Sequence, residues 1–293
     1  MKNIFILLLF FLFSQSLFSQ IDNCLVSLND SRIVVAGGSI TEILFFLDQQ
    51  EKIVALDVTS TFPEKTKDYP SIGYVRGLST EGILSMDPSL IIGENDMGPP
   101  FVVSQLKETE IDFRTIPEKQ SVDGILQKIY CVASILDIEE IADQKINQEL
   151  SSSVTQLNNI VKSNKIKDVK IMLILSMKGS SPIVAGLNTS GHGYIEMLGA
   201  KNAFDSFEGW QVVSPESILK ENPDFIILPQ RDLHKNSDVS KIIDDPIFAN
   251  INAGKQNNFI FDDGMAILGF SPRTIKSALK SANKILESVE WKI

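Results

Sequence analysis

The chain contains few of the residues from which enzyme centres and metal sites are usually built. Its 293 residues include two histidines, His192 and His234, and two cysteines, Cys24 and Cys131. The Cys-x-x-Cys, His-Glu-x-x-His and Gly-x-Ser-x-Gly patterns are absent. A zinc site with several imidazole ligands is hard to assemble from two histidines, although carboxylates could help. We therefore expect a protein that is not an enzyme, with a secreted α/β hydrolase as the alternative.

Positive charge is also scarce. The formal net charge is −10 and no block of Lys and Arg occurs, which makes a nucleic-acid binder a poor interpretation. Gly37-Gly38 lacks the Gly-x-Gly-x-x-Gly spacing of nucleotide-binding loops. A tight turn between a strand and a helix is the simpler interpretation. The N-terminus of that helix could also bind an anionic group of a ligand.

Only the start of the chain carries a long apolar run. Met1-Lys2 provides a positive end, residues 4–13 are apolar, and small and polar residues follow. This pattern predicts a secretory signal peptide over residues 1–19, cleaved near Ser19-Gln20, and hence a soluble exported protein. Asp22-Asn23 suits a lipoprotein cleavage site before Cys24 badly. Export to an oxidising compartment permits a disulfide between Cys24 and Cys131 but does not establish one.

One segment of the sequence occurs twice. Residues 81–94 begin Glu-Gly-Ile-Leu and contain Asp-Pro-Ser-Leu-Ile-Ile, and residues 216–229 begin Glu-Ser-Ile-Leu and contain Asn-Pro-Asp-Phe-Ile-Ile. The offset is 216 − 81 = 135 residues, without a gap. Apolar residues at helical spacing, a turn at Asp/Asn-Pro and a short buried run predict a helix, a turn and a strand. The repetition indicates two similar lobes with a cleft between them, although two ordinary helix–strand units would also fit.

The remaining pattern predicts an α/β clamshell with mostly parallel sheets. Short apolar strands alternate with helical stretches on both sides of the chain's middle. Residues 39–42, Ser-Ile-Thr-Glu, have the spacing of a capping box. Helical spacing without Gly or Pro predicts one long connecting helix over residues 138–165. We therefore expect an N-terminal lobe over residues 24–137 and a C-terminal lobe over residues 166–293.

A glycine followed by an aromatic residue precedes each copy of the repeat. The first lobe has Gly73-Tyr74 and the second has Gly209-Trp210. In such loops Tyr74 and Trp210 could reach a ligand in the cleft, or they could line the cores of the two lobes.

Several segments together resemble one known family. They are Gly-Tyr-Val-Arg-Gly-Leu-Ser-Thr-Glu-Gly-Ile-Leu at residues 73–84, Ala-Gly-Gly-Ser-Ile-Thr-Glu at 36–42, Gly-Pro-Pro at 98–100 and Leu-Gly-Phe-Ser-Pro-Arg-Thr at 268–274. The chain resembles the haem-binding periplasmic proteins of bacterial ABC importers, whose wider relatives bind ferric siderophores or cobalamin. The resemblance covers essentially all of the mature chain and implies a periplasmic location and a role in iron uptake.

The resemblance implies that Tyr74 is the ligand to ferric haem iron. A phenolate is a hard anionic donor, and because free tyrosine has a pKa of about 10, the metal or a cation must favour the charged form. Such relatives place an arginine of the opposite lobe against the phenolate, and Arg231, at the end of the second repeat strand, is the expected partner. Arg76 meets a haem propionate or points outward. His192 is a second axial ligand, a ligand to a second haem, or simply a turn residue.

The repeated glutamates gain a role from the same resemblance. In this superfamily one acidic residue on each lobe docks onto arginines of the inner-membrane permease, and Glu81 and Glu216 match those positions. Acidic residues are also stabilising at helix N-termini by about 0.3–1 kcal/mol, which explains them without a partner. The expected function is to capture ferric haem and deliver it to an ABC importer, with no catalytic cofactor; cobalamin or a ferric siderophore on the same scaffold is the alternative ligand.

Overall fold

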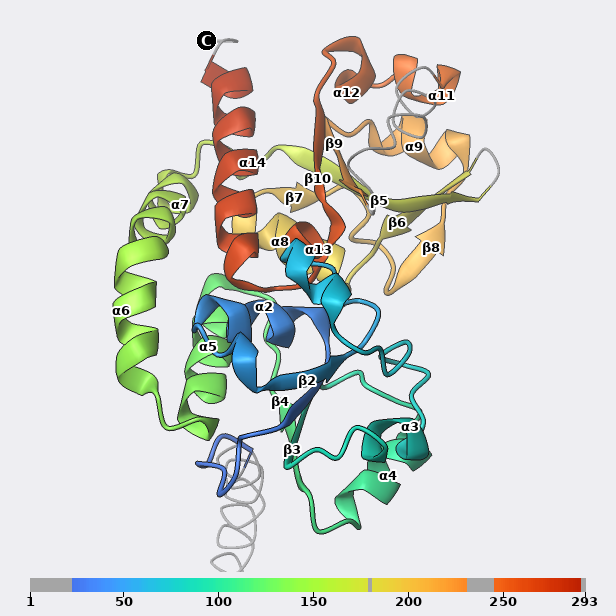
Figure 1. Ribbon diagram of the computed structural model, residues 1–293. Helices are drawn as coiled ribbons and strands as arrows, with labels where there is room; N and C mark the ends of the chain where they lie inside the picture. The colour runs from blue at the N-terminus through green and yellow to red at the C-terminus, as the bar shows by residue number, and fades with distance from the viewer. Residues whose placement is uncertain (1–22, 179–180, 231–244, 291–293) are drawn as a thin grey trace, which may run out of the picture. The chain divides into compact units, whose positions relative to one another are not determined.

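The computed structural model describes residues 23–178, 181–230 and 245–290, which divide into two compact units (Figure 1). The first unit runs to Lys119 and includes 124–146, and the second holds 120–123 and the chain from Asn147 onward. No helix within the described ranges is both long and apolar enough to cross a membrane. The Arg231 and His234 positions and the expected signal peptide lie outside these ranges.

The first unit is built on a four-stranded parallel sheet with the strand order β2-β1-β3-β4. The strands are β1 (Ile33–Ala36), β2 (Ile53–Leu56), β3 (Leu90–Glu94) and β4 (Asp112–Ile116). β1, β2 and β3 are short runs of mostly buried residues, as a sheet covered on both faces requires, whereas the edge strand β4 is mostly half-buried. All four strands end at the same edge of the sheet, which is where ligands of parallel sheets gather.

Helices cover both faces of this sheet (Figure 1). The helical elements are α2 (Gly38–Phe46), η1 (Gln50–Lys52), η2 (Glu64–Asp68), α3 (Thr80–Leu84), α4 (Pro100–Lys107), α5 (Val122–Ile135) and α6 (Glu139–Glu149). Val34, Ile91, Ile83 and Leu106 belong to one buried cluster under α3 and α4. Their strand neighbours Ile33 and Ile92 point to the opposite face, because side chains alternate along a strand.

A disulfide closes the first unit. Cys24 near the start of the described chain pairs with Cys131 on α5, across a sequence separation of 107 residues. Beside it, the Ser27 N–H donates to the Ile135 carbonyl at 2.8 Å. The pairing that the sequence left open is therefore present.

The second unit has a six-stranded mixed sheet with the order β10-β9-β5-β6-β8, and β7 pairs with β5. Its strands are β5 (Lys170–Lys178), β6 (Ser181–Ala185), β7 (Lys201–Asn202), β8 (Trp210–Val212), β9 (Phe225–Gln230) and β10 (Phe259–Asp263). β6 is antiparallel to both β5 and β8, while β7, β9 and β10 run parallel in the sheet. The mostly parallel α/β fold expected from the sequence is confirmed.

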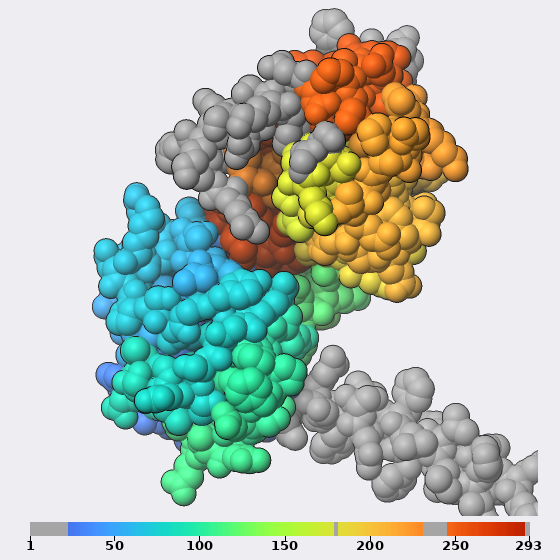
Figure 2. Space-filling view, turned by 90° about the vertical axis from the view of Figure 1, so that its right-hand side faces the viewer, coloured from blue at the N-terminus to red at the C-terminus, as the bar shows by residue number. Residues whose placement is uncertain are grey.

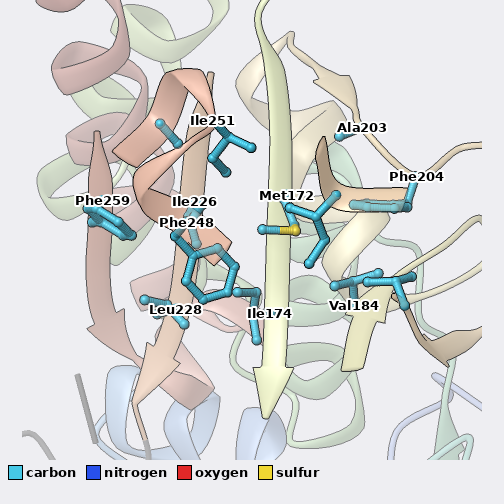
Figure 3. Packing of buried hydrophobic residues seen from close by; sticks show 13 residues of the cluster. Met172, Ile174, Val184, Ala203, Phe204, Ile226, Leu228, Phe248, Ile251 and Phe259 are labelled. Carbon is cyan, nitrogen blue, oxygen red and sulfur yellow. The ribbon is translucent and has the colours of Figure 1, made fainter. Parts of the chain in front are cut away.

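The helices of the second unit are α7 (Ser151–Ser163), α8 (Ser190–Leu198), α9 (Pro215–Glu221), α11 (Pro246–Ala249), α12 (Asn252–Lys255), α13 (Gly264–Leu268) and α14 (Pro272–Glu290). Figure 3 shows the core, where Phe248 of α11 and Ile251, between α11 and α12, lie against Met172 of β5 and Ile226 of β9. Helices α7, α8 and α14 pack together elsewhere in this unit. There the buried Tyr194 hydroxyl bonds to two serines of α14 at 2.9 and 3.0 Å, and its burial raises its pKa to about 12.

The two copies of the repeated segment fold alike. Each begins with a serine N-cap, Ser79 for α3 and Ser214 for α9, whose side chain accepts a backbone N–H of the first turn. After the helix, each copy has a residue in the left-handed conformation before a proline: Asp87 at φ 50° and Asn222 at φ 49°. The strand of the copy then begins, β3 in the first and β9 in the second. The helix, turn and strand predicted from the repetition are therefore present in both units.

The predicted connecting helix is not a single rod. α6 ends at Glu149, α7 begins at Ser151, and Leu150 between them is buried with φ −119° and ψ −33°. Three consecutive serines, residues 151–153, have weak helix propensity at this point. The apolar spacing alone did not reveal this interruption, which falls at a buried leucine.

Candidate functional site

The loop that carries Tyr74, here called the tyrosine loop (residues 72–79), presents the phenol to the surface. Its apolar residues Val75 and Leu78 are each only 4% exposed and belong to the core under α3, whereas Tyr74 is 48% exposed. Gly73 has φ 92°, a conformation that favours glycine, and its carbonyl accepts the Val58 N–H just beyond the end of β2. The loop therefore holds Tyr74 beyond the carboxyl end of the sheet. Residues 72–79 belong to the cyan stretch of the chain in Figure 2.

Arg76 lies against Tyr74 in the same loop. Its Nη1 donates toward the Tyr74 hydroxyl at 3.5 Å, while Nε donates to Asp96 Oδ2 at 2.9 Å and Nη2 also pairs with Asp96. The hydrogen bonds to Asp96 raise the pKa of the Arg76 guanidinium. A permanent cation thus stands next to the phenol without any contribution from the second unit.

A second polar group at the same sheet edge surrounds a buried lysine; we call Ser39, Glu94, Glu118 and Lys128 the lysine cluster. The Lys128 side chain is 1% exposed, and its ammonium donates to Glu118 at 2.6 Å and to the Ser39 hydroxyl at 3.0 Å. The Ser39 hydroxyl in turn donates to Glu94 Oε1 at 2.5 Å. Because Ser39 is fully buried and committed to both neighbours, it is unsuited to the nucleophile role of the hydrolase alternative.

Glu94 occupies the N-terminus of α2. Its Oε1 accepts the Ser39 backbone N–H at 3.0 Å, and a Cβ on Gly37 (φ 148°) would lie 2.4 Å from Glu94 Cγ. The expected capping box at Ser39 is therefore wrong, since Gly37 is the N-cap residue and Ser39 lies inside the helix. The anion position at this helix N-terminus is filled by the protein's own carboxylate.

The environment of Glu94 makes it titrate near neutrality. Burial raises the pKa of Glu94 to about 7, and the Lys128 ammonium and the Ser39 hydrogen bonds oppose that rise. Between the ordinary value of 4.5 and about 7, folded protein keeps a proton that unfolded protein has lost. Ionisation of Glu94 therefore reduces stability as the pH rises through this window.

In the second unit, Trp210 and His192 lie at the same end of α8. A Cβ on Gly191 would meet the Trp210 Cη2 atom at 2.8 Å, so the indole lies against the first turn of this helix. His192 Nδ1 is 3.4 Å from the Asn202 amide nitrogen and Nε2 is 3.6 Å from Glu196. If the amide donates to Nδ1, the neutral ring carries its proton on Nε2, which can then donate to Glu196. Nε2 would have to lose this proton, with Nδ1 as the protonated nitrogen, before it could bind iron.

The two repeated glutamates stand at equivalent places. Glu81 and Glu216 are exposed residues in the first turns of α3 and α9. The backbone N–H of Glu216 and the Ser214 hydroxyl lower the pKa of the Glu216 carboxyl.

Sequence reasoning missed Asp96 and the lysine cluster. Asp57 follows β2 directly, Glu94 is the last residue of β3, and Asp96 lies two residues beyond it. All three lie at carboxyl ends of strands, which is the rule that selected Arg231. Asp57, which is 2% exposed, accepts the Gly37 N–H at 2.8 Å. The same rule applied to the first unit would have found these carboxylates, whereas Lys128 lies on a helix and carried no such signal.

Comparison with known proteins identifies the family. Residues 33–266 match the periplasmic binding protein family, so the chain belongs to it. The apo structure of the periplasmic haem-binding protein RhuT from Roseiflexus sp. RS-1 is 28% identical, with a TM-score of 0.75 over 89% of this chain and 100% of that one. This class consists of solute-binding proteins rather than enzymes.

Two curated relatives are similar over 67% of the chain. The uncharacterized ABC transporter substrate-binding lipoprotein YvrC of Bacillus subtilis is 25% identical over 198 residues, and this match spans 62% of that relative's length. The vitamin B12-binding protein of Pectobacterium atrosepticum is 23% identical over 199 residues, 71% of its length. The similarities thus include binders of different ligands.

Proposed function

We propose that this protein captures ferric haem through Tyr74 in the periplasm and delivers it to an inner-membrane ABC importer. The observation that carries the proposal is the exposed Tyr74 phenol, held past the sheet's carboxyl edge with the Arg76 cation 3.5 Å from its oxygen. A cation favours the phenolate, which is the form that binds ferric iron. The similarity to RhuT, whose name states haem binding, supports the same ligand, and that to YvrC supports an ABC importer as the destination.

The second unit supplies further candidate contacts. We propose that Trp210 and His192, which share one end of α8, contact the porphyrin, and that the His192 imidazole binds the iron or a second haem. Arg231 keeps its expected role beside the phenolate, although it lies outside the described residues. We propose that haem is captured between the two lobes that the sequence suggested.

Cobalamin is the second candidate ligand, because of the similarity to the vitamin B12-binding protein of Pectobacterium atrosepticum. Haem is favoured because the structure presents a hard oxygen donor with an adjacent cation, a combination suited to ferric iron. A ferric siderophore already surrounds its iron with oxygen donors and has less use for Tyr74.

Hemin titration tests the proposal. Wild-type protein is expected to bind hemin with the Soret and charge-transfer bands of a five-coordinate ferric tyrosinate. Tyr74→Phe removes the donor oxygen and should abolish these bands. Tyr130→Phe is the matched control, because Tyr130 is a partly exposed tyrosine of the same unit, bonded to Asp143 and not to the tyrosine loop. Absorption spectroscopy at equal protein and hemin concentrations measures the difference.

A wild-type spectrum without tyrosinate bands, combined with tight binding of cyanocobalamin, would transfer the assignment to cobalamin. Retention of the bands in Tyr74→Phe would show that another residue binds the iron.

Glu81 and Glu216 are proposed to dock onto the permease, one from each unit. Replacing both with alanine is expected to abolish hemin uptake by the importer reconstituted in vesicles while leaving hemin affinity within twofold of wild type. Glu139→Ala with Glu140→Ala is the control, since it removes the same charge from exposed positions at the start of α6. Normal uptake by the Glu81 and Glu216 double variant would refute the docking role.

A further inference from the structure

Arg76 is shared between two partners in the first unit. Three of its nitrogens carry contacts: Nη1 faces the Tyr74 hydroxyl at 3.5 Å, while Nε and Nη2 both donate to the same oxygen of Asp96. The Arg76 side chain is 61% exposed and that of Asp96 46%. An ion pair so exposed adds little to the stability of the protein. Its effect is to fix the position of the Arg76 guanidinium.

The backbone places Asp96 beside the tyrosine loop independently of this ion pair. The Gly98 N–H donates to the Val75 carbonyl at 2.9 Å, and the Leu78 N–H donates to the Gly98 carbonyl at 2.9 Å. On the other side of Asp96, Glu94 is held by Ser39 at the start of α2. Hydrogen bonds therefore hold the 94–98 segment at both ends, and they fix the backbone position of Asp96.

Arg76 has no comparable fixation of its own. It lies two residues from Tyr74, and a long arginine side chain has many rotamers that would point it into solvent. Two donors directed to one carboxylate oxygen remove most of that freedom, because they fix both the position and the plane of the guanidinium. The remaining nitrogen is thereby directed at the phenol oxygen.

We propose that Asp96 is a positioning residue that holds Arg76 against the Tyr74 oxygen, so that the iron-binding phenolate is accompanied by a cation from its own loop before any ligand arrives. The consequence for haem rests on the proposed function of Tyr74. The ordering of Arg76 by Asp96 does not, and it can be measured without ligand.

The test uses full-length mature protein with Asp96→Ala, Asp96→Asn and Asp96→Glu. Hemin is expected to dissociate about tenfold faster from the alanine and asparagine variants, and within twofold of the wild-type rate from the glutamate variant, which keeps the charge. Adding Arg76→Ala to Asp96→Ala should cause no further loss. Asp87→Asn is the matched control: it removes an exposed carboxylate that pairs with Arg32 at the opposite edge of the sheet.

The direction of the change separates positioning from simple charge neutralisation. If Asp96 only weakened the Arg76 charge, its removal would strengthen the phenolate and slow hemin dissociation, and that result would overturn the proposal. An unchanged dissociation rate in Asp96→Ala would overturn it as well.

A measurement on ligand-free protein separates this inference from the proposed function. The Arg76 Nε–H signal in an NMR spectrum should be protected from solvent exchange in wild type and in Asp96→Glu, and lost from Asp96→Ala. An equally protected signal in Asp96→Ala would refute the ordering. Wild-type protein that binds no hemin would refute the proposed function alone, and the arginine signal would still decide whether Asp96 orders Arg76.

Discussion

Removal of the disulfide is expected to lower the free energy of unfolding of the first unit by about 4–5 kcal/mol, since the bond closes a loop of about 100 residues. The bond joins Cys24 to Cys131 across a sequence separation of 107, and the closed loop contains all four strands of the parallel sheet. The double variant Cys24→Ser with Cys131→Ser measures the effect. Because neither tryptophan lies in the first unit, hydrogen exchange of β1 and α5 amides is the appropriate probe.

Reductant provides the control for this prediction. Reduced wild-type protein should become about as unstable as the double variant, and the double variant should not respond to reductant at all. Exchange rates in α14 of the second unit should change little in either case. A double variant whose β1 and α5 amides exchange as slowly as those of the oxidised wild type would show that the bond is dispensable.

The repeated segment illustrates what local sequence could predict. Serine caps, apolar spacing and Asp/Asn-Pro turns are decided by neighbours within about fourteen residues, and both copies fold as expected. The fold class follows because short buried strands alternating with helices leave few arrangements other than a parallel sheet covered on both faces. The exposed position of Tyr74 was left open by the sequence, which also allowed a place in the core; it follows only from the structure, where Val75 and Leu78 anchor its loop.

The errors arose where a residue's role depends on a distant partner. Ser39 has the spacing of a capping box, but Glu94, 55 residues away, takes the N-terminus of α2 and turns the serine inward. Asp96 could not be assigned to Arg76 from spacing, because the pair forms only when the 94–98 segment lies beside the tyrosine loop. The interruption between α6 and α7 at the buried Leu150 was likewise not visible in the apolar spacing.

The lysine cluster leads to a prediction with a defined pH dependence. Lys128→Met keeps the side-chain volume but removes the ammonium that neutralises two carboxylates, and it should cost about 2 kcal/mol at pH 8. At pH 8, above the Glu94 pKa of about 7, the wild-type carboxylate is ionised. Without Lys128 the pKa rises further and Glu94 takes up a proton, which limits this part of the loss to about 1.4 kcal/mol. At pH 5 Glu94 is protonated in the folded protein, so the loss should fall to about 1 kcal/mol, from the partly exposed Glu118 pair and one hydrogen bond.

A second substitution isolates the contribution of Glu94. Glu94→Gln can still accept the Ser39 hydrogen bonds but has no charge, so by itself it should stabilise the protein at pH 8, by at most about 3 kcal/mol, and have little effect at pH 5. Combined with Lys128→Met, it should reduce the pH 8 cost to that found at pH 5, a non-additivity expected of groups in one network. Urea unfolding of the four proteins, followed by hydrogen exchange in the first unit, measures the cycle. A Lys128→Met cost that is equal at both pH values would mean that Glu94 ionises independently of Lys128, and the charge coupling inferred from their positions would be wrong.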